Sequence, residues 1–301
     1  MAGVRVLEDE PNLNAGSGAA LRLDGSAELD AAVMTSRGSF GAVASISDFK
    51  NPSLLARAVM DTPHRLLTGP GASRFARSVG IEPGEPRTEA ALARHKALIT
   101  RLRANEELES VPELVPWSVS TRAGSEGGAP FWQSYLPPAP RQAPPPSAAP
   151  AAPVSSSAPA DAAAPPKAAP GGDTVGVIFR CGPGDYAGAA SSGGPWLALP
   201  GRIGDVPVPG AALYVGDAAA VLVTGPGEAI LTRMLARAVY ERLAAGASAD
   251  ATLSWAGADF KAGELVVAIL DETGAHVGPG IGSAWAALDP TLRTSAKADR
   301  P

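Results

Sequence analysis

The sequence predicts one mixed α+β domain that is interrupted by a long non-globular tract. Runs with strand character and runs with helical character occur on both sides of the tract within the 301 residues. Neither half shows the repeated strand–helix–strand rhythm that would indicate a parallel sheet. Twelve of the 30 prolines fall between Pro137 and Pro170, so the remaining sequence has an ordinary globular composition.

The first half begins with a short helical pattern and continues with strands and three helices. Asp24-Gly25 stands between two strand-like runs, which is a strong signal for a β-hairpin. Pro52 precedes apolar residues at helical spacing, and proline is favoured at the first position of a helix. The expected elements are a helix at 4–10, strands at 19–23, 27–34 and 42–46, and helices at 52–60, 72–79 and 88–107.

The second half resumes with an apolar run directly after Thr174. Residues 228–245 carry apolar side chains at helical spacing, which predicts one continuous amphipathic helix. Glu272-Thr273-Gly274 follows the last strong strand and predicts a turn. The expected strands are 175–179, 187–191, 219–224 and 265–270.

The tract at 137–173 has no means of packing a core, and its composition predicts disorder with polyproline character. One interpretation is an ordinary interdomain linker. Its abrupt end at Thr174, where a buried strand begins, suggests a second interpretation: a chain built to be cut there.

Composition excludes several classes of protein. The net charge is −5 without any basic run, which argues against a nucleic-acid partner. The single cysteine excludes a disulfide framework, and the three histidines lack metal-ligand spacing. No apolar run reaches membrane-spanning length, and acidic residues occupy the N-terminal segment. We expect a soluble cytoplasmic protein.

A cut before Thr174 would give that residue a free α-amine. Such a threonine carries a nucleophile and a base in one residue, because the hydroxyl attacks and the amine accepts its proton. A simpler role is open to the residue type, since threonine is favoured in strands.

Ordered motifs in both halves resemble one known family. In the second half they include Ser-Ser-Gly-Gly at 191–194, Gly-Arg-Ile-Gly-Asp at 201–205 and Thr-Gly-Pro-Gly-Glu at 224–228. In the first half they lie at 7–11, 14–18, 29–34 and 51–60. Together they make the chain similar to the plant-type L-asparaginase/isoaspartyl peptidase family over most of 4–80 and 172–246.

The resemblance implies a four-layer αββα sandwich of the Ntn-hydrolase type. It implies self-cleavage between Asp173 and Thr174, which gives an α fragment of residues 1–136 with the tail 137–173 and a β fragment of residues 174–301. The two fragments are expected to stay associated and to pair as a dimer of two-fragment units. A small molecule or dipeptide is the expected partner.

The resemblance also implies roles around the nucleophile Thr174. Ser192 stands where family members often have threonine, so its hydroxyl is expected to hydrogen-bond Thr174. Thr224 and Gly225 match the oxyanion hole, where a hydroxyl and a backbone N–H stabilise the tetrahedral intermediate. The alternatives are a serine in a turn and the plain end of a strand.

A second group of residues matches the family's substrate site. Arg202 matches the guanidinium that grips an α-carboxylate, and Asp205 matches the acid that holds an α-ammonium. Gly227 would add a carbonyl near the ammonium, and Asn14 matches a residue beside the nucleophile. An Arg202–Asp205 surface salt bridge and an ordinary turn asparagine are the simpler interpretations.

No cofactor is expected apart from a structural Na⁺, which the resemblance places on backbone carbonyls of the loop from Leu7 to Ser17. The carbonyl positions implied are those of Leu7, Glu8, Glu10, Leu13, Ala15 and Ser17. No metal ligation by side chains is expected.

The chain also departs from the family pattern at its start. Family members open with a strand bearing a Gly-rich motif and then a helix, whereas Met1 falls inside that helix. A misassigned start codon, a fragment and a divergent member are the three explanations; we favour the first because the retained motifs are intact.

The leading functional hypothesis is a threonine-nucleophile amidohydrolase that releases L-aspartate from L-asparagine, from β-aspartyl dipeptides, or from both. One alternative is a taspase-like endopeptidase that cuts after aspartate. The other is a truncated, unprocessed and inactive homologue.

Overall fold

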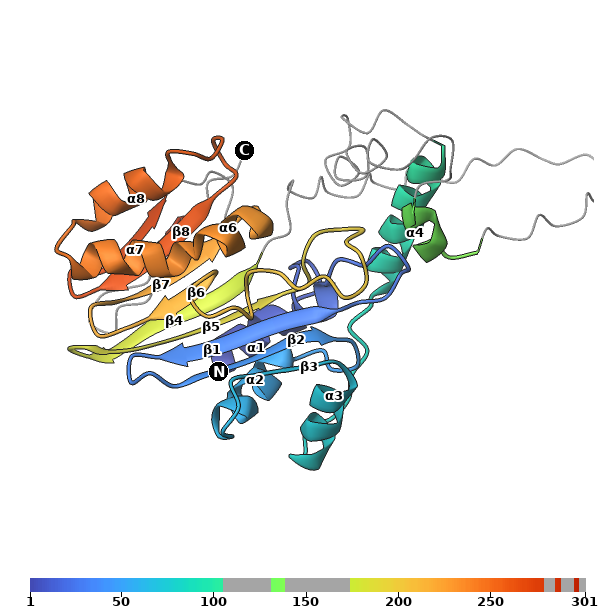
Figure 1. The fold of residues 1–301 in the computed structure, drawn as a ribbon, viewed down its shortest axis with the longest axis horizontal. Coiled ribbons are helices and arrows are strands. Elements are labelled where there is room, and N and C mark those ends of the chain that lie inside the picture. The colour runs from blue at the N-terminus through green and yellow to red at the C-terminus, as the bar shows by residue number, and fades with distance from the viewer. Residues whose placement is uncertain (105–130, 139–173, 279–284, 288–294, 298–301) are drawn as a thin grey trace, which may run out of the picture.

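The computed structural model describes residues 1–104, 131–138, 174–278, 285–287 and 295–297. In these residues, helices enclose two sheets (Figure 1). The elements of the first half are α1 (Ala2–Asp9), the 3-10 turn η1 (Gly16–Gly18), β1 (Leu29–Thr35), β2 (Phe40–Ile46), α2 (Pro52–Met60), β3 (Leu66–Thr68), α3 (Gly69–Ser78), α4 (Glu89–Arg103) and η4 (Phe131–Tyr135). Those of the second half are β4 (Val175–Gly182), β5 (Asp185–Ser192), β6 (Leu213–Val215), β7 (Ala219–Thr224), α6 (Gly227–Arg233), α7 (Leu235–Ala244), α8 (Ala249–Gly257), β8 (Val266–Asp271), β9 (Ala275–Gly278), β10 (Trp285–Ala287) and β11 (Ser295–Lys297).

The larger sheet combines strands from both halves of the chain. Its order is β3-β2-β1-β5-β4, and β1 pairs antiparallel with β5, which sets Asp30 opposite Ser192. The second sheet, of order β6-β7-β8-β9, comes from the second half alone. β10 and β11 pair only with each other among the described strands. The two halves therefore share one sheet, and the expected mixed α+β class is confirmed.

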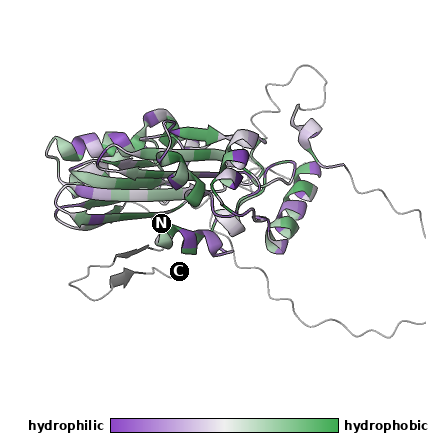
Figure 2. Cartoon of the chain, turned by 90° about the horizontal axis from the view of Figure 1, so that it is seen from below, coloured by the Kyte–Doolittle hydropathy of each residue, from purple (hydrophilic) through white to green (hydrophobic). Residues whose placement is uncertain are grey.

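The two sheets pack face to face, with helices on their outer faces. α1, α2 and α3 lie against the five-stranded sheet, whereas α7 and α8 lie against the four-stranded one (Figure 1). Hydrophobic residues concentrate in the strands, and hydrophilic residues recur along the helices (Figure 2). This layering buries both faces of the central strands.

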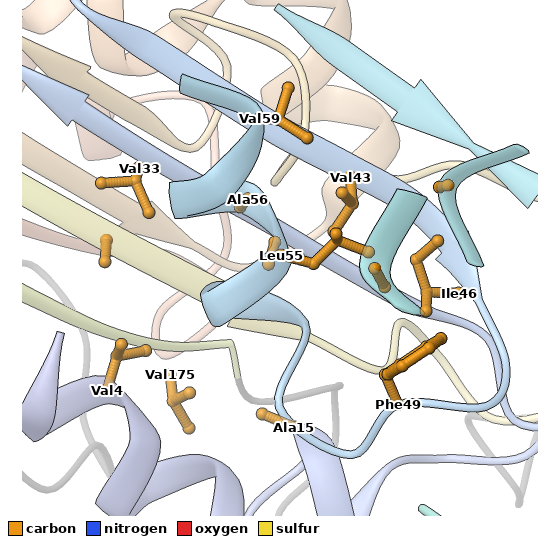
Figure 3. Packing of buried hydrophobic residues seen from close by; sticks show 14 residues of the cluster. Val4, Ala15, Val33, Val43, Ile46, Phe49, Leu55, Ala56, Val59 and Val175 are labelled. Atoms are coloured by element: carbon orange, nitrogen blue, oxygen red, sulfur yellow. The ribbon is translucent and has the colours of Figure 1, made fainter. Parts of the chain in front are cut away.

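Alternation along β1 shows how the layers are built. Ala31 and Val33 join the apolar cluster beneath α2, and Figure 3 shows Val33 in this cluster with Ala56 and Val59 of that helix. Ala32 and Met34 point the opposite way and join a cluster that also contains Leu213 of the other sheet. Successive strand residues point to opposite faces, so one strand contributes to both cores.

Most predicted elements form close to their expected limits. α2 matches its predicted range, and Thr88 caps α4, since its Oγ1 accepts the Ala91 N–H at 3.1 Å. The predicted strands at 42–46, 175–179, 187–191, 219–224 and 265–270 correspond to β2, β4, β5, β7 and β8. Almost all of the tract at 137–173 lies outside the described residues.

The predicted hairpin around Asp24-Gly25 is wrong in its first strand. The turn itself forms, because the Gly25 N–H donates to the Arg22 carbonyl at 2.9 Å. The preceding residues bond instead to a distant loop: the Leu197 N–H donates to the Leu21 carbonyl, and the Leu23 N–H to the Ala198 carbonyl. The Arg22 N–H also donates to the Ser26 carbonyl at 2.8 Å, so one cross-turn pair forms, but residues 19–23 do not continue as a strand.

The predicted continuous helix at 228–245 is also wrong, because Met234 breaks it into α6 and α7. Met234 adopts φ 48° and ψ 49°, a left-handed conformation. The break leaves the first amides of α7 free to donate to a neighbouring loop, from Ala236 to the Ala211 carbonyl and from Arg237 to the Gly210 carbonyl, each at 2.9 Å. Apolar spacing alone does not reveal such a partner.

No helix among the described residues is long and apolar enough to cross a membrane.

Replacing Met234 with glycine is expected to stabilise the protein. Glycine adopts the left-handed conformation without the steric cost that methionine bears, about 1 kcal/mol. The expected effect is a rise in Tm of about 2–4 °C. Ala238→Gly, inside α7, is the matched control and should lower Tm. A lower Tm for Met234→Gly would show that the methionine side chain contributes more than the strain costs.

Candidate functional site

Thr174 and Thr224 meet where the two sheets pack together. Val175 joins the cluster beneath the outer helices, so its neighbour Thr174 points toward the other sheet, as does Ile178. Thr224 ends β7 and shares its face with Ala220, which points toward the five-stranded sheet. The Thr174 N–H donates to the Thr224 Oγ1 at 3.3 Å. The structure thus brings together two predicted site residues that are 50 positions apart.

A glycine permits this close approach of the sheets. A Cβ on Gly176, two residues after Thr174, would collide with the methyl groups of Leu222, which lies two residues before Thr224. A side chain at 176 would force Leu222 out of its place beside the threonine pair, because packed interiors have little room to yield.

Ser192 lies across the sheet from Thr174. β4 and β5 pair Val175 with Ser191, and extending that register by one residue sets Thr174 opposite Ser192. The Ser192 Oγ accepts the Gly194 N–H at 3.1 Å. Its expected hydrogen bond to Thr174 stays a prediction.

Asn14 is tied to the same turn. Its Nδ2 donates to the Gly194 carbonyl at 2.7 Å, its Oδ1 accepts the Ala20 N–H at 2.7 Å, and its carbonyl accepts the Gly193 N–H at 3.0 Å. Asn14 therefore holds the chain that leaves Ser192, rather than serving only its own local turn.

Arg202, Asp205 and Gly227 converge as the motif predicts. A Cβ on Gly227 would lie 2.6 Å from the Arg202 Nη2 and 2.9 Å from the Asp205 Oδ1. The predicted simple alternative, an Arg202–Asp205 surface pair, is wrong. Arg202 instead pairs with Glu228 at 2.9 Å, and the Glu228 side chain is 72% exposed. The exposed Glu228 carboxylate thus forms an ion pair with the Arg202 guanidinium, the group that was predicted to bind substrate.

Asp205 is a buried acid without a full set of partners. It is 6% exposed, and its Oδ2 has no hydrogen-bond partner. Burial raises the pKa of Asp205 to about 6, although the nearby Arg202 opposes the shift. A buried carboxylate oxygen left unpaired is costly, so this atom is suited to a cationic partner.

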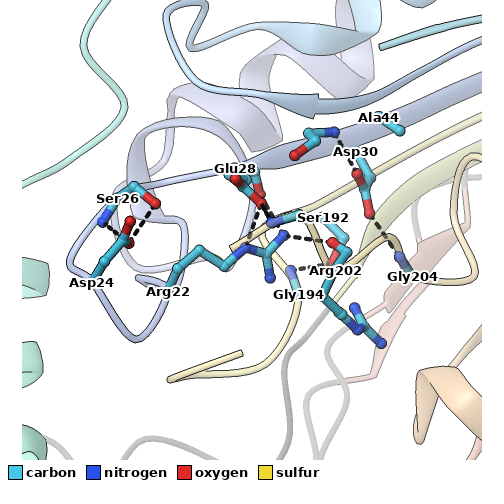
Figure 4. Close-up of polar contacts among 12 residues, drawn as sticks. Arg22, Asp24, Ser26, Glu28, Asp30, Ala44, Ser192, Gly194, Arg202 and Gly204 are labelled. Atoms are coloured by element: carbon cyan, nitrogen blue, oxygen red, sulfur yellow. Dashed lines mark hydrogen bonds and ion pairs between the residues drawn. The ribbon is translucent and has the colours of Figure 1, made fainter. Parts of the chain in front are cut away.

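Sequence reasoning missed the charged residues that support the Arg202 loop, namely Arg22, Glu28 and Asp30. Figure 4 shows them around that loop. The Glu28 Oε2 accepts the Gly201 N–H at 2.8 Å, the Asp30 Oδ2 accepts the Gly204 N–H at 3.0 Å, and the Arg22 Nη2 donates to the Arg202 carbonyl at 3.2 Å. The available signal was a charge inside an apolar run, as in Leu21-Arg22-Leu23.

The loop predicted to bind Na⁺ follows α1. The carbonyls of Leu7, Glu10, Leu13 and Ala15 each accept one backbone N–H, at 2.9 to 3.3 Å. The buried Glu8 side chain binds elsewhere, since its carboxylate accepts the Ser53 N–H at 3.0 Å and the Ser53 hydroxyl at 2.7 Å. Burial raises the pKa of Glu8. The described residues contain no cluster of acidic, histidine or cysteine side chains that could hold a metal ion.

Two predicted residues remain, Asp173 at the cleavage site and Gly225 in the oxyanion hole. Thr174 begins a described segment, and the predicted cleavage partner Asp173 lies outside the described residues. Gly225 follows Thr224, and a Cβ there would collide with the Glu264 carbonyl oxygen, so this position accepts no side chain.

The fold and site define a two-sheet α+β protein with a pair of threonines at the sheet junction and a buried acid–guanidinium site beside them. Residues 1–277 match the model of the asparaginase family, and the chain belongs to that family. The expected resemblance is confirmed.

Named relatives agree with this assignment. A plant-type L-asparaginase of Pyrococcus horikoshii is 32% identical over 72% of this chain and 56% of its own length. An isoaspartyl peptidase of Salmonella typhimurium is 33% identical over 72% of this chain and 54% of its own. A bovine isoaspartyl peptidase/L-asparaginase is 32% identical over 70% of this chain and 51% of its own. The chain thus spans just over half the length of these relatives.

Asp205→Asn is expected to stabilise the protein above pH 6. The folded-state pKa of Asp205 is about 6, above its ordinary 3.8, so the folded protein binds the proton more tightly than the unfolded chain does. Stability therefore falls as pH rises from about 4 through 6, by up to about 3 kcal/mol. The asparagine side chain at 205 does not ionise, so the variant does not lose this stability as pH rises.

Urea unfolding at pH 4 and pH 8 measures the effect, with the exposed Glu82→Gln as the control for loss of one charge. An equal stability difference between wild type and Asp205→Asn at both pH values would contradict the shifted pKa.

Proposed function

We propose that this chain is an autoprocessed threonine-nucleophile amidohydrolase that hydrolyses L-asparagine or β-aspartyl dipeptides to L-aspartate. The observation that carries the proposal is the contact of Thr174 with Thr224 at the sheet junction, beside the convergence of Arg202 and Asp205 at Gly227. The names of the relatives, plant-type L-asparaginase and isoaspartyl peptidase, supply the substrate classes.

The proposed architecture is the Ntn-hydrolase αββα sandwich, which the helix, sheet, sheet and helix layers support. In this proposal, residues 1–136 form the α fragment, 137–173 its tail, and 174–301 the β fragment. Pairing of β1 with β5 would hold the two fragments together after the cut. Two such units would form a dimer, and the chain would act in the cytoplasm.

Maturation would use the same threonine as catalysis. The Thr174 hydroxyl attacks the carbonyl carbon of residue 173, the peptide C–N bond breaks, and an ester links residue 173 to Thr174. Water then hydrolyses the ester and leaves Thr174 with a free α-amine. The nitrogen that donates to the Thr224 Oγ1 in the described chain would be that amine.

Hydrolysis would proceed through an acyl-threonine. The hydroxyl attacks the substrate's side-chain amide carbon, and the amine accepts the hydroxyl proton. The Thr224 hydroxyl and the Gly225 N–H stabilise the oxyanion. Ammonia, or an amino acid from a dipeptide, leaves with that proton. Water then attacks the ester and L-aspartate is released. Ser192 would orient the nucleophile.

The substrate's amino-acid end would be held by opposite charges. Arg202 would bind the α-carboxylate in place of the exposed Glu228, and the unpaired Asp205 Oδ2 would accept from the α-ammonium. The Gly227 carbonyl would add an acceptor, and Asn14 would fix the turn that follows Ser192. A buried acid suits a free amino group, which disfavours an endopeptidase that acts within a protein chain.

Aspartate release tests the proposal. Wild type is expected to release L-aspartate from L-asparagine, from β-aspartyl dipeptides, or from both, and Thr174→Ala to release none. Thr174→Ser, which keeps a hydroxyl, is the matched variant and should retain partial activity. Cleavage of a folded protein substrate without activity on these small substrates would favour the endopeptidase. No cleavage of any of them would favour an inactive homologue.

We also propose that the loop from Leu7 to Ser17 binds a structural Na⁺. Carbonyl oxygens are hard ligands suited to hard cations, and each retains a second lone pair beside its backbone hydrogen bond. The ion would fix the loop that leads to Asn14. The variant Thr174→Ala is used because, without the nucleophile, it would stay one uncut chain. It is expected to melt at a higher temperature in NaCl than in choline chloride at equal ionic strength. Equal melting temperatures in the two salts would contradict Na⁺ binding.

A further inference from the structure

Arg22 is a fully buried arginine whose donors are only partly used. It is 0% exposed, and its Nε pairs with the Glu28 Oε2 at 3.2 Å. Its Nη2 donates to the Glu28 carbonyl at 3.0 Å and to the Arg202 carbonyl at 3.2 Å (Figure 4). Its Nη1 is buried without any partner. The Nη2 of Arg22 thus supports the loop that carries Arg202, while Nη1 has no acceptor.

The nearby acids Glu28 and Asp30 accept hydrogen bonds from other groups. The Glu28 Oε2 accepts both the Arg22 Nε and the Gly201 N–H. Each oxygen of Asp30 accepts a backbone N–H, one from Ser45 and one from Gly204, both at 3.0 Å. A carboxylate that arrives with a ligand could provide the acceptor that these residues do not.

The unpartnered Arg22 Nη1 and the Arg202 Nη1 both lie next to Gly194. A Cβ built on Gly194 would lie 2.8 Å from the Arg22 Nη1 and 3.1 Å from the Arg202 Nη1, so the two nitrogens lie within about 6 Å of each other. An oxygen about 2.9 Å from each donor can bridge such a pair, and charge-assisted N–H···O bonds have that length. The two like charges also repel, which an anion between them would relieve.

The site contains a second orphaned atom of the opposite kind, the Asp205 Oδ2. Arg202 lies beside both, since its Nη1 faces Gly194 and its Nη2 faces Gly227 next to Asp205. An α-amino acid carries one carboxylate and one ammonium. It would therefore supply the missing acceptor to Arg22 and the missing donor to Asp205 at once.

We propose that Arg22 is the second guanidinium of a two-arginine carboxylate clamp, with its Nη1 donating to the substrate's α-carboxylate beside Arg202. The inference rests on the proposed function and deepens it. Both arginines would bind the substrate's α-carboxylate, so a substrate would need that group to be free. Arg22 would thus determine specificity for amino-acid ends over capped ones.

Paired substrates test this role. L-Asparagine carries the α-carboxylate, and its α-amide, aspartic diamide, lacks it. The double variant Arg22→Met with Glu28→Gln removes the guanidinium together with the carboxylate that it pairs with. Glu28→Gln alone, which keeps Arg22, is the matched control. Relative to that control, the double variant is expected to lose roughly tenfold or more in kcat/KM on L-asparagine, mainly through KM. The diamide should change by less than about threefold.

Two outcomes would overturn the proposal. An equal loss on both substrates would show that Arg22 acts on the site as a whole and not on the α-carboxylate, and no loss would show that Nη1 does not reach the carboxylate. Should the double variant fail to fold, Arg22→Lys keeps the charge but lacks Nη1, and the same selective loss on L-asparagine is expected.

Binding of the product separates this proposal from the proposed function. L-Aspartate, measured by calorimetry, is expected to bind wild type at least about tenfold more tightly than its α-amide, isoasparagine, and the double variant, which keeps Arg202, should lose part of that preference. If wild type hydrolyses nothing yet shows the preference, and the double variant weakens it, the catalytic proposal fails and the clamp stands. If wild type shows no preference, the clamp is overturned whatever the activity.

Discussion

The packing of the two sheets against each other is the constraint on which the site depends. Thr174 enters from the five-stranded sheet and Thr224 from the four-stranded one, and their 3.3 Å contact exists only at the observed sheet separation. Gly176 leaves room for Leu222 at that separation. The small residues of β1 and β5 have the same effect, because they allow strands buried on both faces to lie between a helix layer and a second sheet.

The loop that carries Arg202 depends on a second constraint, which links the two halves of the chain. The backbone at 201–204 is held by hydrogen bonds to three charged side chains of the segment 22–30, more than 170 residues earlier. β1 begins at Leu29, at the end of that segment, and pairs with β5, which ends at Ser192. Because β5 also pairs with β4, which follows Thr174, the threonine pair and the Arg202 loop are both positioned by one sheet that combines the two halves.

The sequence reveals local features well and distant partners poorly. The α2 helix could be predicted to the residue, because Pro52 marks its start and apolar spacing defines its inner face. The sharp change from a proline-rich tract to an apolar strand singles out Thr174 in the sequence alone. Arg22, Glu28 and Asp30 could not be assigned from their neighbours, because their partners lie on a remote loop. The break at Met234 was missed for the same reason, since it depends on the carbonyls of Gly210 and Ala211. Motif resemblance compensated for this at Arg202 and Asp205, but it carried no information about which acid pairs with Arg202.

The central claim is that Thr174 is a working nucleophile, and the mass of the purified protein under denaturing conditions tests it most directly. The account predicts two fragments, the second of which begins at Thr174, and a single uncut species for Thr174→Ala. One intact chain in the wild-type protein, with the mass of the full sequence, would contradict it.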